Sequence, residues 1–190
     1  MIVHLAGSAT NLDKDLPFLK TIIKTLNEND AVLARDWIEP TYQERVVKKV
    51  KPADVDWKAV MDNNLNAIHR ADVVIVEATN YSFTQGFQVA TALQQKKPVL
   101  IVSRKPLKNT AISGYRHKML SMKEYKKDDD LAAIVKQFIR DNTIATKDLR
   151  FNMFIDRPIY NYLRSMSYES GKNKSEIIRD LINKEIEKKD

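Results

Sequence analysis

Small and polar residues with the chemistry to hold an anionic ligand follow two apolar runs of this sequence. The first group comes directly after residues 2–6, and the second follows residues 72–77. Ligands of open parallel sheets bind beyond the carboxyl ends of the strands. The second group also precedes a helical pattern, whose amino terminus would favour an anion. The sequence therefore predicts a ligand site near Gly7, Ser8, residues 77–88 and Ser103.

Several other kinds of site are excluded by the composition. The 190 residues include no cysteine, which excludes a disulfide framework, a thiolate metal site and a cysteine nucleophile. His4, His69 and His117 form no metal-ligand pattern, and the segment at Gly7 lacks the glycines and lysine of a phosphate-binding loop. We therefore expect no metal and no cofactor. The apolar runs are shorter than the roughly 20 residues of a membrane span, and with no secretory leader the expected location is the cytoplasm.

The elements that must position the site follow from alternating strand-like and helical patterns over residues 1–142. Strand-like runs occupy residues 2–6, 31–34, 72–77, 98–103 and, more weakly, 119–122. Helical patterns occupy residues 12–27, 54–70, 85–95 and 128–142. This order predicts an α/β fold in which helices cover both faces of a five-stranded parallel sheet.

Asn64 stands out within the second of these helices. It lies four residues after Val60 and four before Ile68, on or beside the inward apolar stripe. A polar side chain there needs a hydrogen-bonding partner, which is either a ligand or a buried backbone group. Asp36 and Trp37 follow the second strand, so topology alone also places them near the ligand.

Three segments of this domain resemble the nucleoside 2-deoxyribosyltransferases. They are residues 5–8 (LAGS), 64–72 (NLNAIHRAD) and 77–88 (EATNYSFTQGFQ). By pattern, the most similar branch is the 2′-deoxynucleoside 5′-monophosphate N-glycosidases. The resemblance implies a flavodoxin-like subunit that pairs with a second subunit and holds a nucleoside or nucleotide at the strand ends.

The same resemblance implies a reaction and identifies what this chain lacks for it. The family cleaves an N-glycosidic bond with retention: a glutamate attacks C1′ of the sugar and an aspartate assists. Gln88 stands at the glutamate position and Asn64 at the aspartate position. Neither amide can ionise, so we expect a site that binds without cleaving.

Other family positions are better matched. Ser82 corresponds to the serine that holds the 5′-phosphate, and Gly86 permits close approach of the backbone before a helix. Gly7, Ser8 and Glu77 also match residues of the ligand loops. In relatives, a serine of the second subunit completes the phosphate site, and Ser113 lies in the corresponding segment. The expected ligand residues are thus Gly7, Ser8, Asn64, Glu77, Ser82, Gly86, Gln88 and Ser113.

A second pattern occupies residues 150–190, after a linker at 143–149. Residues 150–155 alternate in period two, Pro158 suits the first turn of a helix, and Gly171 suits its end. Asn173 and Glu176 form a capping pattern before a last amphipathic helix. This β-α-α order resembles the ribbon-helix-helix DNA-binding modules. One strand and two helices cannot bury a sufficient core, so we expect a homodimer or a higher even homo-oligomer.

The ribbon-helix-helix resemblance implies that strands of two chains enter the major groove of DNA. The expected DNA-binding residues are Arg150, Asn152 and Phe154 on the ribbon, and Lys172, Asn173, Lys174 and Ser175 at the last helix. The net charge of +7 fits an anionic partner. A dimerisation tail without DNA binding is the other interpretation of this segment.

Three functions follow from these patterns. The leading hypothesis is a DNA-binding transcriptional regulator whose catalytically inactive deoxyribosyltransferase-like domain binds a nucleotide or a related small ligand. The first alternative is an active deoxynucleotide N-glycosidase or deoxyribosyltransferase that uses Glu77 or another acid, with the tail serving oligomerisation. The second alternative is an autorepressor of the plasmid or toxin–antitoxin type.

Overall fold

The chain divides into two compact units, Met1–Thr143 and Ile144–Asp190. The computed structural model describes residues 1–108, 111–143 and 153–188. Each unit is described by itself below.

The first unit is built on a five-stranded parallel sheet, as the sequence predicts. Its strands are β1 (Ile2–Ala6), β2 (Val32–Leu33), β3 (Val73–Glu77), β4 (Val99–Ser103) and β5 (Leu120–Glu124). They lie in the order β2-β1-β3-β4-β5, and every neighbouring pair is parallel. This is the flavodoxin-like strand order. All residues of β3 and β4 are buried, because helices cover both faces of the sheet and the two strands are apolar up to their last residues, Glu77 and Ser103.

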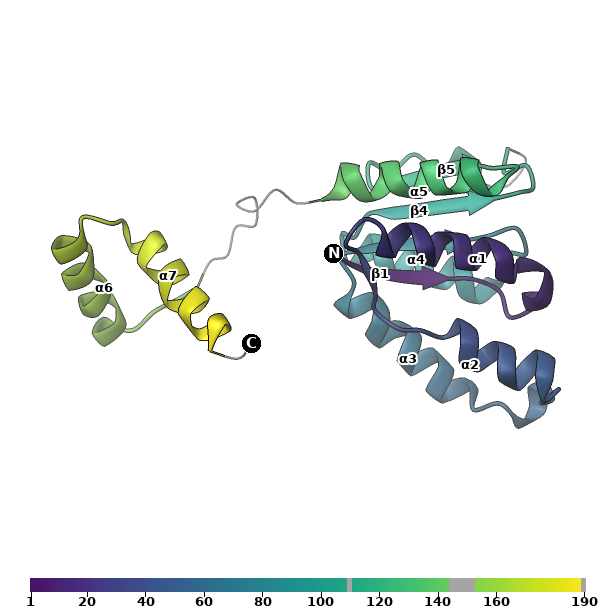
Figure 1. Ribbon diagram of the computed structural model, residues 1–190, viewed down its shortest axis with the longest axis horizontal. Helices are drawn as coiled ribbons and strands as arrows, with labels where there is room; N and C mark the ends of the chain where they lie inside the picture. Colours follow the sequence, from purple (N-terminus) through teal and green to yellow (C-terminus); the bar gives the residue numbers. More distant parts are fainter. Residues whose placement is uncertain (109–110, 144–152, 189–190) are drawn as a thin grey trace. The chain divides into compact units, whose positions relative to one another are not determined.

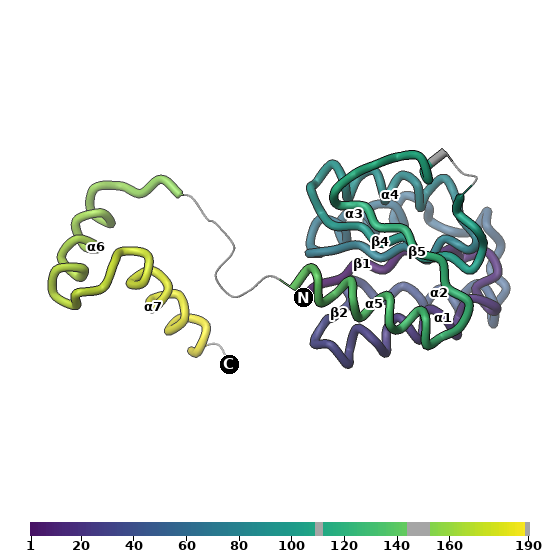
Figure 2. The backbone as a smooth tube through the Cα atoms, turned by 90° about the horizontal axis from the view of Figure 1, so that it is seen from above, coloured from purple at the N-terminus to yellow at the C-terminus, as the bar shows by residue number. Residues whose placement is uncertain are grey.

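Helices form a layer on each face of this sheet (Figures 1 and 2). α1 (Leu12–Asn27) and α5 (Asp128–Asn142) pack against one face, where Leu19 and Val135 join the apolar core. α3 (Trp57–Arg70) and α4 (Phe83–Gln94) pack against the other face through Ile68 and Ala92. The crossover helices expected from the sequence are therefore present, and α1 and α5 have the bounds that the periodicity predicts.

The segment between β2 and α3 contains elements that the sequence patterns do not predict. α2 (Ile38–Tyr42) continues directly into the π-helical segment η1 (Gln43–Val47), and a 3-10 turn, η2 (Pro52–Asp54), follows. Only Ile38 of α2 and η1 is buried, so this stretch has no apolar stripe to reveal a helix. The helix expected from residue 54 starts instead at Trp57, because the Asp56 side chain accepts a hydrogen bond from Ala59 N (2.9 Å) and caps it.

The second unit contains two helices, α6 (Arg157–Ser170) and α7 (Lys174–Glu187). Gly171 ends α6 in the left-handed conformation with φ of 69°. Asn173 and Glu176 cap the start of α7 reciprocally, as the sequence pattern indicates. Leu163 of α6 and Ile177 of α7 are buried.

The strand expected at residues 150–155 is not found in its described part. Residues 153–156 have no regular secondary structure, and Arg150 and Asn152 lie outside the described residues. The physical reason is that a ribbon strand obtains its backbone hydrogen bonds from the strand of a second chain, and a single chain offers no such partner. The ribbon-helix-helix arrangement therefore stays a prediction. No helix within the described ranges is long and apolar enough to cross a membrane.

Candidate functional site

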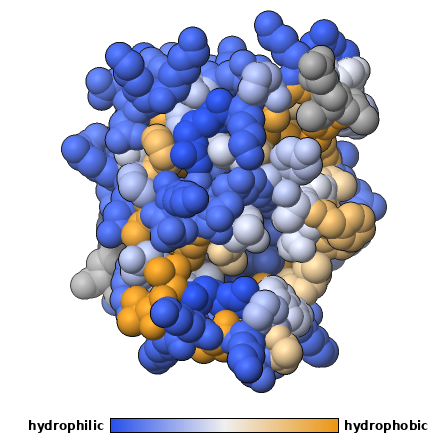
Figure 3. Space-filling view, turned by 90° about the vertical axis from the view of Figure 1, so that its right-hand side faces the viewer, coloured by the Kyte–Doolittle hydropathy of each residue, from blue (hydrophilic) through white to orange (hydrophobic). Residues whose placement is uncertain are grey.

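A cavity of about 270 Å³ opens at the carboxyl end of β1. This volume is slightly below the range of ligand pockets, which begins at about 300 Å³. Figure 3 faces this side of the molecule and shows hydrophobic patches separated by hydrophilic side chains. The cavity walls come from β1 and the loop after it, from α2 and η1, from α3, and from the start of α4. Its lining residues include Gly7, Ser8, Thr10, Arg35, Trp37, Thr41, Glu44, Arg45, Val55, Trp57, Val60, Asn64, Ser82, Thr84, Gln85 and Gln88.

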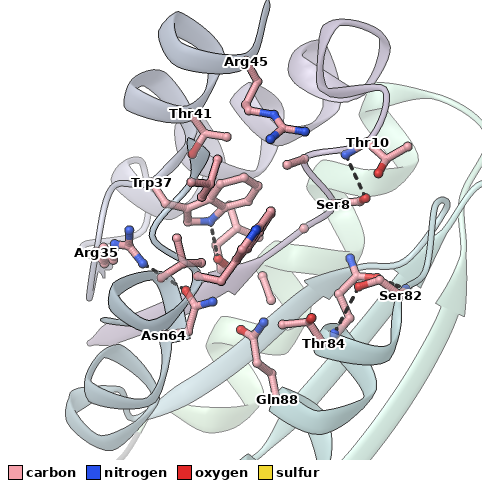
Figure 4. A pocket seen from close by; sticks show the side chains of 18 of the residues that line it. Ser8, Thr10, Arg35, Trp37, Thr41, Arg45, Asn64, Ser82, Thr84 and Gln88 are labelled. Carbon is pink, nitrogen blue, oxygen red and sulfur yellow. Dashed lines mark hydrogen bonds between the residues drawn. The ribbon is translucent and has the colours of Figure 1, made fainter. Parts of the chain in front are cut away.

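Gln88 lies deep in this cavity and is held there by His4. His4 Nε2 and Gln88 Oε1 are 2.7 Å apart, and both side chains are buried. The amide oxygen only accepts, so His4 donates from Nε2 and is the Nε2–H tautomer. Burial lowers the pKa of His4, and the positive charge of Arg35 lowers it further. A neutral histidine thus fixes the amide, whose Nε2 can act only as a donor (Figure 4).

Asn64 projects into the cavity from α3 (Figure 4). Its Oδ1 accepts a hydrogen bond from Arg35 Nη1 at 3.0 Å. Arg35 lies just after β2, and the bond joins two walls of the cavity. The polar partner that Asn64 was expected to need is therefore an arginine side chain that itself lines the site.

Gly7 allows Trp37 to pack directly over the loop that follows β1. A Cβ at Gly7 would lie 3.0 Å from Trp37 Cζ2 and 3.3 Å from Leu19 Cδ2, which leaves little room for any side chain. Trp37 Nε1 donates to Leu5 O at 2.7 Å and so anchors the indole to β1. The close approach explains the need for glycine and gives the cavity an aromatic wall.

The amino terminus of α4 forms the opposite side of the site. Ser82 caps this helix: its Oγ accepts from Gln85 N at 3.3 Å, and Gln85 Oε1 accepts from Ser82 N at 2.8 Å. Ser82 and Thr84 are exposed and line the cavity, while Ser8 is buried beside Thr10, whose N–H its Oγ accepts at 3.1 Å. Hydroxyls at a helix amino terminus are suited to an anionic group.

The charge of the cavity lining is positive. Among the described residues that line it, the charged ones are Arg35, Arg45 and Glu44. Glu44 is exposed to solvent, whereas Nη1 of Arg45 is completely buried and has no acceptor within the described residues. The site is thus rich in donors, and its single carboxylate faces water.

Glu77 lies outside this cavity, although it was expected to contact the ligand. It is only 1% exposed, and its Oε1 accepts from Tyr125 OH (2.9 Å), from Thr79 N (3.3 Å) and from the Thr79 hydroxyl. Burial raises the pKa of Glu77. Gly86, Ser113 and Asp36 are also absent from the described residues that line the cavity.

Candidate DNA-binding residues of the second unit are partly engaged within it. Lys172 Nζ lies 2.8 Å from Asp180 Oδ2, and Lys174 Nζ lies 4.2 Å from the centre of the Tyr160 ring. Asn173 caps α7, where Ser175 is also located, and Phe154 is fully exposed.

Comparisons with known proteins bear on the fold that carries this cavity. No protein-family model matches the chain. The 5-hydroxymethyl-dUMP N-hydrolase of Danio rerio is 24% identical over 147 residues, which cover 75% of this chain and 99% of that protein. The structure of the CMP N-glycosidase BcmB of Clostridium botulinum matches with a TM-score of 0.53 at 12% identity, over 73% of this chain and 99% of that one.

The chain contains a nucleotide N-glycosidase-like fold. This supports the resemblance to the deoxyribosyltransferases drawn from three sequence motifs. Within this fold the cavity brings together Gly7, Ser8, Asn64, Ser82 and Gln88, and also Trp37. Sequence reasoning missed Thr41, Glu44 and Arg45, because α2 and η1 carry no periodic pattern that would predict them.

Proposed function

We propose that the nucleotide N-glycosidase-like unit binds a nucleoside monophosphate and leaves its N-glycosidic bond intact. The observation that carries this proposal is the pairing of Gln88 with His4 deep in the cavity. A retaining displacement needs an ionised oxygen as nucleophile, and an amide supplies none. Asn64 likewise offers an amide, whose oxygen already accepts from Arg35.

One side of the cavity is polar and the other is aromatic, and this arrangement supports a nucleotide as the ligand. The hydroxyls of Ser82 and Thr84 and the amino terminus of α4 suit the phosphate. Trp37 and Trp57 suit the flat face of a base on the other side. The sugar would then lie near Gln88, whose amide can hydrogen-bond to it without attacking C1′.

Binding and cleavage should be measured on the same preparation. Titration calorimetry with a panel of ribo- and deoxynucleoside monophosphates should detect binding to the full chain. Chromatography of the same mixtures should detect no free base above a protein-free control. The double variant Asn64→Asp, Gln88→Glu places a carboxylate at both positions. It tests whether these two carboxylates are enough for the protein to cleave the nucleotide. Base release by the wild-type protein would contradict the proposal.

An active N-glycosidase is the competing function, and the comparisons favour it because both similar proteins are named as enzymes. Such an enzyme would need a carboxylate in the cavity. Glu44 is the one acid among the described residues that line it, and Glu77 lies outside. If the wild-type protein releases base, Glu44→Gln and Glu77→Gln identify which acid is used.

For the second unit we propose dimerisation and operator binding. Ile159, Leu181, Ile182 and Ile186 are all at least 43% exposed in a single unit, although they are large and apolar. Burying them against a second copy would remove this exposed apolar surface from water. Ile182→Lys should therefore lower the molar mass measured by light scattering, whereas the exposed Lys184→Ala should leave it unchanged. An unchanged mass for Ile182→Lys would contradict this interface.

DNA binding can be tested by footprinting on a DNA sequence that has been selected for binding to the protein. Asn152→Ala should weaken binding and relax sequence preference, whereas Lys174→Ala should mainly reduce the salt dependence. Unchanged footprints for both variants would indicate an interaction tail. Regulation further requires that a nucleotide changes the DNA affinity, and equal affinities with and without every nucleotide tested would contradict it.

A further inference from the structure

Gln88 presents an unpaired donor to the cavity, although its side chain is buried. Only 4% of the residue is exposed, and it lines the cavity. Its Oε1 is paired with His4 Nε2, whereas its own Nε2 has no partner among the described residues. That nitrogen is not sealed from solvent as Nδ1 of His4 is. The solvent that reaches it is therefore that of the cavity, into which the amide projects in Figure 4.

The orientation of this amide is set by His4. Nδ1 of His4 is completely buried and has no partner among the described residues, so a proton there would be a buried donor without an acceptor. Orphaned N–H groups are rarer in protein interiors than acceptors with an unfilled lone pair. The proton of the neutral ring therefore lies on Nε2, where it binds Gln88 Oε1. Turning the amide over would remove this hydrogen bond, so Gln88 offers its NH₂ group to a ligand.

The place of Gln88 in the cavity indicates which part of a nucleotide it meets. In the proposed binding mode the base lies against Trp37, and the phosphate lies at the amino terminus of α4. Figure 4 shows Gln88 between Asn64, from α3, and Thr84, from the start of α4. In a β-nucleoside 5′-phosphate the base and the 5′ carbon project from one face of the sugar ring, and the 2′- and 3′-hydroxyls project from the other. A nucleotide that spans the cavity therefore turns its hydroxyl-bearing face towards the deeply placed Gln88.

We propose that Gln88 is a specificity-determining residue whose amide donates to the 2′-hydroxyl oxygen, so that the site selects ribonucleoside over 2′-deoxyribonucleoside monophosphates. The assignment rests on the proposed nucleotide-binding function and names its sugar. The 2′ carbon adjoins the carbon that carries the base, where a nucleophile at this position would attack. A 2′-deoxyribonucleotide excludes water from the amide and supplies no acceptor in its place, which leaves a buried donor unpaired. Sites built to hydrogen-bond a substrate hydroxyl reject analogues lacking it much more effectively than apolar pockets do.

Matched pairs of nucleotides test this assignment. Titration calorimetry on the full chain should show each ribonucleoside monophosphate binding roughly 5- to 100-fold more tightly than its 2′-deoxy counterpart, the range for a buried donor that loses its partner. The 3′-deoxy counterpart should bind like the ribonucleotide. Gln88→Met removes the donor and keeps a side chain of similar length, so the preference for ribose should disappear. Gln94→Met is the matched control and should keep the preference, because Gln94 is exposed at the end of the same helix.

A measurement on the wild-type protein makes the test independent of whether Gln88→Met folds normally. The NMR resonances of the Gln88 side-chain amide should shift when a ribonucleotide saturates the protein, and much less with its 2′-deoxy counterpart. Equal affinities for the two sugars, a preference that survives in Gln88→Met, or equal shifts would each overturn the assignment and leave the proposed function standing. If the wild-type protein binds no nucleotide of either sugar, the proposed function itself fails and the assignment fails with it.

Discussion

Glu77 provides a sharp test of the electrostatics at the end of β3. The side chain is buried, and its Oε1 accepts hydrogen bonds from Thr79 and Tyr125. Burial raises its pKa above the ordinary value of 4.5, although these hydrogen bonds and the positive charge of Arg104 act in the opposite direction. The folded protein therefore binds this proton more tightly than the unfolded chain does.

The sign of the pH dependence follows from that difference. Near pH 4 the carboxyl is largely protonated in both states, so it contributes little to the pH dependence of folding. As the pH rises from 4.5 towards the folded-state pKa, only the unfolded chain releases the proton. The free energy of unfolding then falls by about 1.4 kcal/mol for each pH unit. Above the folded-state pKa the loss is complete and the contribution is constant.

Glu77→Gln should remove this loss, because a glutamine oxygen can accept the same hydrogen bonds without carrying a charge. We expect the variant to match the wild type near pH 4 and to exceed its unfolding free energy at pH 7, by about 1.4 kcal/mol for each pH unit that separates the folded-state pKa from the ordinary value. The two tryptophans of the chain, Trp37 and Trp57, both lie in the first unit. Urea unfolding followed by tryptophan fluorescence therefore measures the stability of this unit alone.

A variant less stable than the wild type at pH 7 would refute this reasoning. It would mean that the attraction between the Glu77 carboxylate and Arg104 outweighs the cost of burying the charge. Tyr125→Phe is the complementary control, since it removes one donor to Glu77 and keeps the ring. It should lower the unfolding free energy by about 1 to 3 kcal/mol, the cost of a buried group that loses its partner.

Further predictions concern the cavity. Gly7→Ala should displace Trp37, lower the unfolding free energy by about 1 to 3 kcal/mol and weaken nucleotide binding; equal fluorescence and affinity to the wild type would contradict the packing argument. Gly86→Ala should instead stabilise α4 by roughly 0.5 to 1 kcal/mol, because its Cβ would meet nothing within 4 Å. Gln88→Glu should raise the pKa of His4 by placing a carboxylate beside it, and an unshifted histidine titration by NMR would argue against the contact.

Much of the fold can be predicted from the sequence because its strongest signals are local. The apolar runs of β3 and β4 identify buried parallel strands, and the spacing of α1 and α5 identifies amphipathic helices. The caps of α7 and the glycine after α6 are likewise local hydrogen-bonding and steric signals. Parallel connections then leave few possible arrangements, so the sheet and its binding edge follow.

α2 and η1 could not be predicted in this way. Their residues are mostly exposed and lack helical periodicity. α2 packs against α1, and η1 continues from it and brings Arg45 to the cavity wall. The pairing of His4 with Gln88 joins residues 84 positions apart, so it too depends on how α4 packs on the sheet.

The sequence by itself determined that a parallel α/β sheet would carry polar residues at its carboxyl edge, and that amides would replace carboxylates there. Only the tertiary structure decided which of those residues meet. It placed Asn64 against Arg35, put Glu77 with Tyr125 outside the cavity, and left Nη1 of Arg45 without an acceptor among the described residues. The physical reason is that residue type sets what a side chain can donate or accept, whereas its partners depend on which helices the sheet brings together.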